Sequence, residues 1–271
     1  MTDKPAWSDA FAAHQLPTLP SLPLADAREW AFGGSTGAGI SVAIIDSGVD
    51  ADHPDVGGVT SAVAMESDTT RDEGYRAVEG PHEDLVGHGT ACAAIIRSLA
   101  PDVDLHSIRV LGTNLKGRGL LFHAGIQWAV EHGIDVANLS LSSKSETMYG
   151  PLHDISDRAY FARTLLVCAA NNSPGPTFPS EYASVVSVAA RSSDDPWSLS
   201  CNPEPPVEFG ACGIDIRVAW SDGGSTVATG NSFAAPHVAA MAALILAKHP
   251  GLTPYQVKTV LQAVSENAKV S

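Results

Sequence analysis

The chain is short of positive charge. Its 271 residues include 16 Lys and Arg against 30 Asp and Glu, which gives a formal net charge of −14. Proteins that bind nucleic acid gather cations on the surface that meets the phosphates. We therefore expect no nucleic acid as the main partner.

Long uncharged apolar segments are missing as well. The main apolar run, residues 235–247, is too short to cross a membrane. The N-terminal residues lack the apolar core that a signal peptide needs. We expect no membrane partner and a cytoplasmic location.

Cysteine is scarce and carries no metal-binding pattern. The four cysteines are Cys92, Cys168, Cys201 and Cys212, and no C-x-x-C pair that would indicate zinc is present. Cys92 and Cys168 lie in apolar sequence, which predicts small buried side chains. Cys201 and Cys212 flank a loop rich in Pro and Glu and could bridge, but a cytoplasmic location favours free thiols.

Short apolar runs alternate with helical patterns along most of the chain. This alternation predicts an α/β fold, a three-layer sandwich with a mostly parallel central β-sheet and helices on both faces. The irregular, polar residues 57–84 predict a surface excursion. We expect an N-terminal extended arm at residues 1–24, laid on the domain or partly disordered, and one domain at residues 25–271. The expected strands are residues 40–45, 104–111, 134–141, 164–170, 185–190 and 214–220, and the expected helices are residues 88–99, 120–131, 149–163, 233–247 and 253–264.

The stretch at residues 230–250 predicts a central buried helix, because its apolar residues do not keep to one side. Pro236 is expected in the first turn, where its missing N–H costs nothing. Ser232 then lies where loop becomes helix, among unpaired N–H groups that favour developing negative charge. This position suits a nucleophile, although Ser is also a favoured helix cap.

Two other polar residues lie at comparable junctions. Asp46 ends the apolar run at residues 40–45, and open α/β sheets place their sites at the carboxyl ends of strands. His88, between two glycines, opens the helix expected at residues 88–99. Taken alone, Asp46 also fits a turn-forming residue, and a lone His is more often a satisfied surface or core residue than a catalytic one.

Three motifs occur in a fixed order: VAIIDSGVDADHPDV at residues 42–56, GHGTACAAI at 87–95 and GNSFAAPHVAAMAALIL at 230–246. The segment LLVCAANNSPG, residues 165–175, lies between the second and the third. Together they resemble the Asp, His and Ser motifs of the subtilisin-like serine proteases, and the resemblance covers residues 25–265. It implies a peptidase domain with the subtilisin-like fold and a peptide or protein substrate. We expect no cofactor and no metal.

The resemblance assigns roles to individual residues. It implies a triad of Asp46, His88 and Ser232, with an oxyanion hole formed by Asn172 and the Ser232 N–H. The residue types of this triad suit nucleophilic catalysis, because a histidine of ordinary pKa can activate a serine and a carboxylate can orient the histidine. The residues that correspond to substrate-binding positions are Leu115, Lys116, Gly117, Ser140, Leu141, Ser142, Ala170 and Thr177, the last near the pocket floor.

The sequence also departs from the family pattern. The usual Thr of Gly-Thr-Ser is Asn231, the usual Gly after Ser-Leu is Ser142, and the Gly before the oxyanion Asn is Asn171. The His88 helix runs to Pro101 without room for the family's calcium-binding loop, and the N-terminal residues are too few for its folded pro-region.

Three functions remain open at this stage. The first is a serine endopeptidase, either a housekeeping enzyme or one specialised for peptide maturation. The second is a protease-like protein that is catalytically weak or inactive and holds peptides without cutting them. The third is a metal hydrolase built from His82, His88 and nearby acids, although their spacing matches no short zinc motif.

Overall fold

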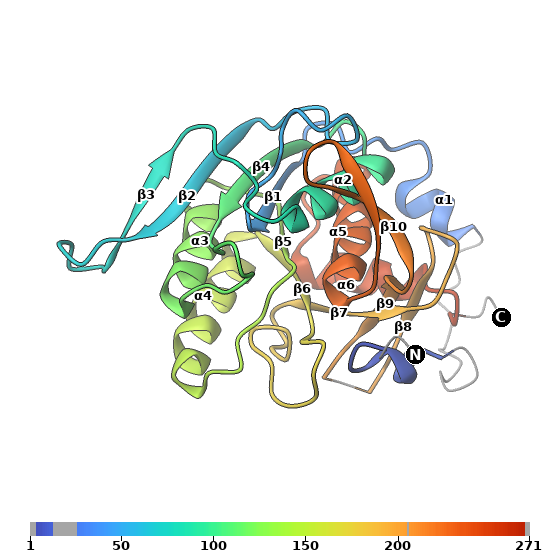
Figure 1. Ribbon diagram of the computed structural model, residues 1–271. Coiled ribbons are helices and arrows are strands. Elements are labelled where there is room, and N and C mark those ends of the chain that lie inside the picture. Colours follow the sequence, from blue (N-terminus) through green and yellow to red (C-terminus); the bar gives the residue numbers. More distant parts are fainter. Residues whose placement is uncertain (1–3, 13–25, 205, 269–271) are drawn as a thin grey trace.

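The computed structural model describes residues 4–12, 26–204 and 206–268. Within these residues, the largest sheet has nine strands in the order β3-β2-β4-β1-β5-β6-β7-β9-β8 (Figure 1). The seven inner strands of this order, β2-β4-β1-β5-β6-β7-β9, pair in parallel. The edge strands β3 and β8 pair antiparallel to their neighbours. The strands are β1 (Ser41–Asp46), β2 (Ser61–Ser67), β3 (Tyr75–Glu79), β4 (Asp104–Arg109), β5 (Val136–Leu139), β6 (Leu165–Ala169), β7 (Val186–Arg191), β8 (Leu199–Cys201) and β9 (Phe209–Cys212).

Helices cover both faces of this sheet. The helices are α1 (Ala27–Phe32), α2 (His88–Leu99), α3 (Gly119–Glu131), α4 (Tyr149–Ala162), α5 (Asn231–Lys248) and α6 (Pro254–Ala263), with short 3₁₀ turns η1 (Ser8–Phe11) and η2 (Glu146–Met148). Side chains alternate along β1, so Val42 and Ile44 join the core that contains α2 and α5, while Ala43 and Ile45 join the core that contains α3 and α4. The expected three-layer sandwich is therefore confirmed.

Helix α5 lies at the centre of one layer (Figure 1). Its residues from Phe233 to Ile245 are all buried, and it packs against β5, β6, β7 and β9 as well as α2. An all-round apolar helix is stable only in such a place. The expectation of a buried central helix is confirmed.

Two expectations about strands were wrong. Residues 57–84 are not an irregular excursion, because they contain the hairpin of β2 and β3. Only Val63, Ala64 and Met65 of this hairpin are buried and β3 lies at the sheet edge, so the apolar signal was weak. The last expected strand, residues 214–220, is outside the central sheet: β10 (Ile216–Trp220) pairs with β11 (Gly224–Ala228) in a separate two-stranded ribbon.

Part of the expected N-terminal arm is laid on the domain. Residues 4–12 include η1, which packs against β7, and the side chain of Phe11 is fully buried. The rest of the predicted arm, residues 1–3 and 13–24, lies outside the described residues.

All four cysteines are buried free thiols, as favoured for Cys201 and Cys212. Among the described residues, no helix combines the length and the apolar character that crossing a membrane requires.

Candidate active site

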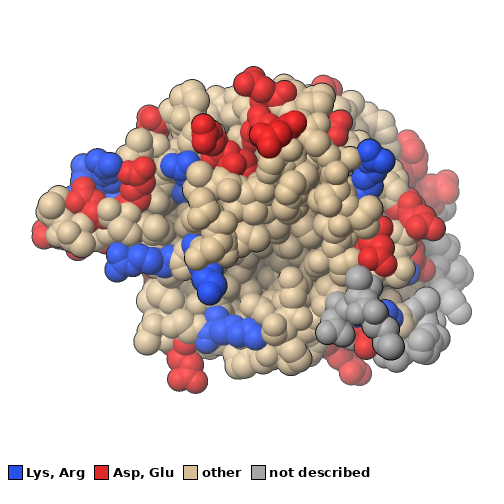
Figure 2. Space-filling view, in the orientation of Figure 1, with Lys and Arg blue, Asp and Glu red and all other residues tan. Residues whose placement is uncertain are grey.

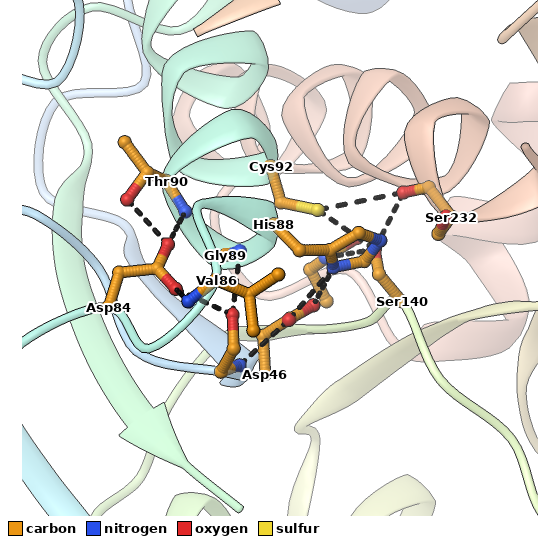
Figure 3. A network of polar contacts seen from close by, with 11 residues as sticks. Asp46, Asp84, Val86, His88, Gly89, Thr90, Cys92, Ser140 and Ser232 are labelled. Carbon is orange, nitrogen blue, oxygen red and sulfur yellow. Dashed lines mark hydrogen bonds and ion pairs between the residues drawn. The ribbon is translucent and has the colours of Figure 1, made fainter. Parts of the chain in front are cut away.

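Asp46 ends β1, and its side chain is fully buried. Its backbone oxygen accepts hydrogen bonds from the N–H groups of Val110 and Leu111, at 2.8 and 3.1 Å. Its carboxylate accepts from the Ser47 N–H at 2.7 Å. Nδ1 of His88 lies 2.8 and 2.9 Å from its two oxygens (Figure 3). Because an ionised carboxylate only accepts hydrogen bonds, Nδ1 carries the proton and Nε2 keeps a lone pair in the neutral ring.

The contact with Asp46 controls the charge of the imidazole. Burial by itself would lower the pKa of His88, because it disfavours the charged form. The negative charge of Asp46 and its hydrogen bond outweigh burial, so the pKa of His88 lies above its ordinary value. The site therefore favours a proton on His88 once one arrives.

Asp84 fixes the start of the helix that carries His88 (Figure 3). One carboxylate oxygen accepts from the N–H and Oγ1 of Thr90, at 2.8 and 2.6 Å. The other accepts from the Val86 N–H at 3.0 Å and from Ser47 Oγ at 2.7 Å. A negative charge here meets the unpaired N–H groups and the positive dipole end of α2. Asp84 thereby ties the first turn of α2 to the residue that follows Asp46.

Ser232 lies in the first turn of α5, and its carbonyl has unusual partners. Pro236 is in the second turn, not in the first as expected, since α5 begins at Asn231. Having no N–H, Pro236 leaves the Ser232 carbonyl without a helical partner. Ser140 Oγ donates to this carbonyl at 2.7 Å, and Cys92 Sγ lies 3.6 Å from it (Figure 3). The turn that carries Ser232 is thus anchored to the segment after β5 and to α2.

Ser232 and the amide of Asn172 approach the same point. A Cβ added to Gly230 would lie 3.1 Å from Ser232 Oγ and 3.5 Å from Asn172 Nδ2. The Oδ1 of Asn172 accepts the Asn231 N–H at 2.9 Å, which fixes the amide and leaves Nδ2 to donate. The structure thus brings a hydroxyl and an N–H donor together beside Gly230.

The side chain of Asn231 is fully buried and committed to other contacts. Its Oδ1 accepts the Ala190 N–H at 2.8 Å. Its Nδ2 lies 3.1 Å from the oxygens of Ala6 and Ala170 and 3.3 Å from that of Asn171. Asn231 is therefore a structural link and not a second free donor beside Ser232.

The loop with Leu115, Lys116 and Gly117 follows β4. Gly112 and Lys116 close it, with the Gly112 N–H donating to the Lys116 oxygen at 3.0 Å. Leu115 has a positive φ of 54° and is exposed. Gly117 packs so closely that an added Cβ would lie 2.7 Å from the Val110 oxygen. The loop is held against the end of β4, near the residues that bind the Asp46 backbone.

The segment with Ser140, Leu141 and Ser142 follows β5. Ser140 directs its hydroxyl toward the Ser232 carbonyl, whereas Leu141 and Ser142 are partly exposed. Asn171 Nδ2 lies 3.5 Å from Ser142 Oγ. Two residues that depart from the family pattern therefore contact each other.

Ala170 and Thr177 lie deeper. Ala170 is buried, and its oxygen accepts from Asn231. Thr177 is fully buried, with its Oγ1 3.0 Å from Ser180 Oγ. The next residue, Phe178, forms a two-way backbone bridge with Ser143 at 2.7 and 2.8 Å. This bridge joins the region of Thr177 to the segment after β5.

His82 does not join His88. Its Nε2 is 2.8 Å from Ser107 Oγ, and burial lowers the pKa of His82 to about 4. Across the described residues, the one cluster of potential metal-binding side chains consists of Asp46, His88 and Cys92. The histidine pair expected for a metal hydrolase is thus not brought together.

Sequence reasoning missed one supporting residue, Asp84, and one supporting role, that of the Ser140 hydroxyl. Asp84 had a usable signal, since an acid shortly before a helix start is favoured there. No signal in the sequence indicated the role of the Ser140 hydroxyl, because its partner, the Ser232 carbonyl, lies 92 positions away in the chain.

Comparisons with known proteins identify relatives that cover nearly the whole chain. The sequence profile of the subtilase family matches residues 37–270. Subtilisin DY from Bacillus licheniformis is 31% identical over 266 residues, which cover 92% of each chain. Subtilisin E from Bacillus subtilis (strain 168) is 31% identical over 247 residues, covering 86% of this chain and 62% of the relative.

Solved structures give the same result. The structure of a cold-adapted subtilisin-like serine proteinase superimposes with a TM-score of 0.71 at 30% identity and covers 91% of this chain and 88% of that one. A psychrophilic protease gives a TM-score of 0.70 at 26% identity, covering 90% of both chains.

The position of Asp84 yields a prediction about activity and acid stability. Asp84→Ala should misplace His88 and lower kcat/KM by about 10- to 100-fold, the range expected when a catalytic group shifts slightly. Hydrogen bonds to Thr90 and to nearby N–H groups overcome the effect of burial and lower the pKa of Asp84. Its stabilising effect should be complete above the unfolded pKa of about 3.9 and be lost as pH falls through the lower folded value.

Kinetic assays and urea unfolding between pH 2 and 7 would check this. Glu83→Ala is the matched control, because Glu83 is exposed and contributes only its backbone oxygen to a contact. Equal activity of the two variants would remove Asp84 from the site.

Proposed function

The chain belongs to the subtilase family and is a serine endopeptidase, and we propose that Asp46, His88 and Ser232 are its catalytic triad. The observation that carries the proposal is the buried contact of Asp46 with His88 Nδ1. It leaves Nε2 as a base at the start of α2, while Ser232 stands at the start of α5. Phe233 follows Ser232, and the centroid of its ring lies 5.2 Å from the centroid of the His88 ring, so the two helix starts lie side by side.

In the proposed reaction, Nε2 of His88 takes the Ser232 hydroxyl proton while Oγ attacks the substrate carbonyl. Asp46 stabilises the imidazolium that forms. The imidazolium then gives its proton to the leaving amine as the C–N bond breaks, and water releases the acyl group in a second cycle. Among the described contacts, no hydrogen bond yet joins Ser232 Oγ to Nε2; such bonds often tighten only with substrate.

The oxyanion of the tetrahedral intermediate would be held by Asn172 Nδ2 and by the Ser232 N–H. Support comes from the fixed amide of Asn172 and from its approach to the point beside Gly230 that Ser232 Oγ also approaches. These donors are in place before charge develops, so they need no rearrangement in the transition state.

A peptide substrate would lie between two segments. Leu115, Lys116 and Gly117 would flank it on one side, and Ser140, Leu141 and Ser142 on the other. Ala170 and Thr177 would border the pocket for the residue before the cut bond. The bridge between Ser143 and Phe178 supports this arrangement, because it holds the second segment beside the proposed pocket.

The charge near the first segment suggests the kind of substrate. Arg109, Lys116 and Arg118 line one cavity of about 470 Å³ that no acidic side chain lines. In the described part of the chain, none of the three forms an ion pair. Figure 2 shows Lys and Arg gathered on one side of the central hollow, while Asp and Glu predominate elsewhere on this face. We propose acidic side chains in the substrate and, with them, a specialised role in peptide or protein maturation.

We also propose a cytoplasmic location. All four cysteines are free thiols, which agrees with a reducing compartment. Cell fractionation would check it, and recovery of the chain from the culture medium would contradict it.

Ser232→Ala and His88→Ala should each abolish peptide cleavage and leave the fold intact. Their losses should not multiply, because nucleophile and base act as a unit. The measurement is kcat/KM of both single variants and the double variant, with circular dichroism as the test of folding. A double variant that loses the product of the two single losses would refute the assignment.

Asn172→Ala should lower kcat by about 10²- to 10³-fold with little change in KM, since the oxyanion exists only in the transition state. Asn231→Ala should instead lower the melting temperature, because it removes the contacts of a fully buried amide. Steady-state kinetics and thermal unfolding separate the two effects. A kcat within about threefold of the parent for Asn172→Ala, under 1 kcal/mol of barrier, would end its proposed role.

Lys116→Glu should lower kcat/KM for acidic peptides about tenfold relative to neutral ones, because it turns a modest attraction into repulsion. Arg217→Glu makes the same charge change outside the cavity and serves as control. The difference should shrink in 1 M salt, where exposed charges are screened. An unchanged ratio of acidic to neutral cleavage would show that the cavity does not select the substrate.

A further inference from the structure

The N-terminal segment 5–11 is bound directly behind the proposed oxyanion donor. The Ala6 N–H donates to the backbone oxygen of Asn172 at 2.8 Å. The Ala6 oxygen accepts from Asn231 Nδ2 at 3.1 Å. Asn231 in turn donates its own N–H to Asn172 Oδ1 at 2.9 Å. Ala6 therefore closes a small ring of contacts that holds Asn172 by both its backbone and its side chain.

Phe11 anchors this segment. Its side chain is 1% exposed and packs with Ala170, Ala189 and Val207. A Cβ on Gly210 would lie 2.2 Å from the ring, so the ring rests directly on the backbone of β9. Ala170 lies two residues before Asn172, so the anchor and the ring of contacts meet the same stretch of chain.

Other features of the segment oppose its binding. Trp7 has a positive φ of 77°, a conformation that costs energy in residues other than Gly. Its Nε1 and the Oγ of Ser8 are buried without hydrogen-bond partners. The ion pair of Lys4 with Asp9 is exposed and adds little. Trp7 is also partly buried against the Phe11 cluster, so the segment is held by this apolar packing and by the two hydrogen bonds of Ala6.

We propose that residues 5–11 are a positioning element for Asn172, completing the oxyanion hole from behind. The inference rests on the proposed function. Without Ala6, the Asn172 backbone oxygen loses its donor and Asn231 loses one acceptor. The backbone that carries the Asn172 amide is then held less firmly, and the amide can shift away from the oxyanion. A displacement of a preorganised donor weakens transition-state binding while leaving substrate binding unchanged. Asn231, which stands where the family has Thr, joins the segment to the site.

Two full-length variants remove the two supports separately. Ala6→Pro deletes the N–H that binds the Asn172 oxygen, and Phe11→Ala empties the anchor pocket. Each should lower kcat about tenfold and leave KM within about twofold, as expected for a loss confined to the transition state. Ala6→Gly keeps the N–H and is the matched control, so its kcat should stay close to that of the parent. The affinity for a peptide aldehyde, whose adduct with Ser232 carries the oxyanion, should fall in parallel with kcat.

Gly210→Ala tests the anchor from the opposite side, because its methyl group would collide with the Phe11 ring. It should lower kcat like Phe11→Ala, and the double variant should be no worse than Phe11→Ala alone, since the collision then disappears. Phe32→Ala is the control for lost core packing; Phe32 stacks on Trp197 and packs against the main core. It should lower the melting temperature and leave kcat and the aldehyde affinity unchanged.

The outcomes separate the two levels of the account. If Ala6→Pro and Phe11→Ala lower the melting temperature but keep kcat and aldehyde affinity at the level of Phe32→Ala, the segment is only a brace and the inference is overturned. If the parent cleaves peptides but Asn172→Ala does not reduce kcat, the oxyanion assignment fails together with the inference. A parent chain that cleaves no peptide overturns the proposed function itself.

Discussion

The buried contact between Asp46 and His88 is the interaction on which the rest of the site depends. The Asp46 carboxylate is buried away from solvent at the end of β1, so it needs hydrogen-bond donors from the protein. The Ser47 N–H and His88 Nδ1 supply them. The strand position of Asp46 is fixed by Val110 and Leu111, which follow β4 and bind the Asp46 backbone oxygen. The direction of the imidazole, and the charge it can carry, follow from this contact and from the helix start that Asp84 secures.

The site is built where two helix starts meet the carboxyl ends of parallel strands. α2 delivers His88 and α5 delivers Ser232, and the two helices pack against each other. Pro236 frees the Ser232 carbonyl, and Ser140 binds it, so the nucleophile's turn is tied to the segment after β5. Unpaired N–H groups at a helix start favour an anion, which is the charge that acyl transfer creates. The same edge of the sheet receives Ala6 from the N-terminus.

The sequence was sufficient for the features that rest on local pattern. The run at residues 40–45, the glycine-flanked His88 and the apolar stretch after Ser232 each predicted an element that the structure contains. What could not be predicted depends on contacts between distant residues. The β2–β3 hairpin buries few side chains, so its apolar signal was weak. The sequence shows only that Asn231 precedes Ser232, and its contacts with Ala190, Ala170 and Ala6 are what make it a structural link.

The central claim is that His88, paired with Asp46, activates Ser232. Its most direct test is the rate at which a fluorophosphonate labels Ser232 as a function of pH. Only neutral His88 can accept the serine proton, and contact with Asp46 raises the pKa of His88. The account predicts that labelling accelerates with pH and reaches half its maximal rate above the ordinary histidine value of about 6.5. A labelling rate that stays flat between about pH 5 and 9, where a histidine base must titrate, would contradict it.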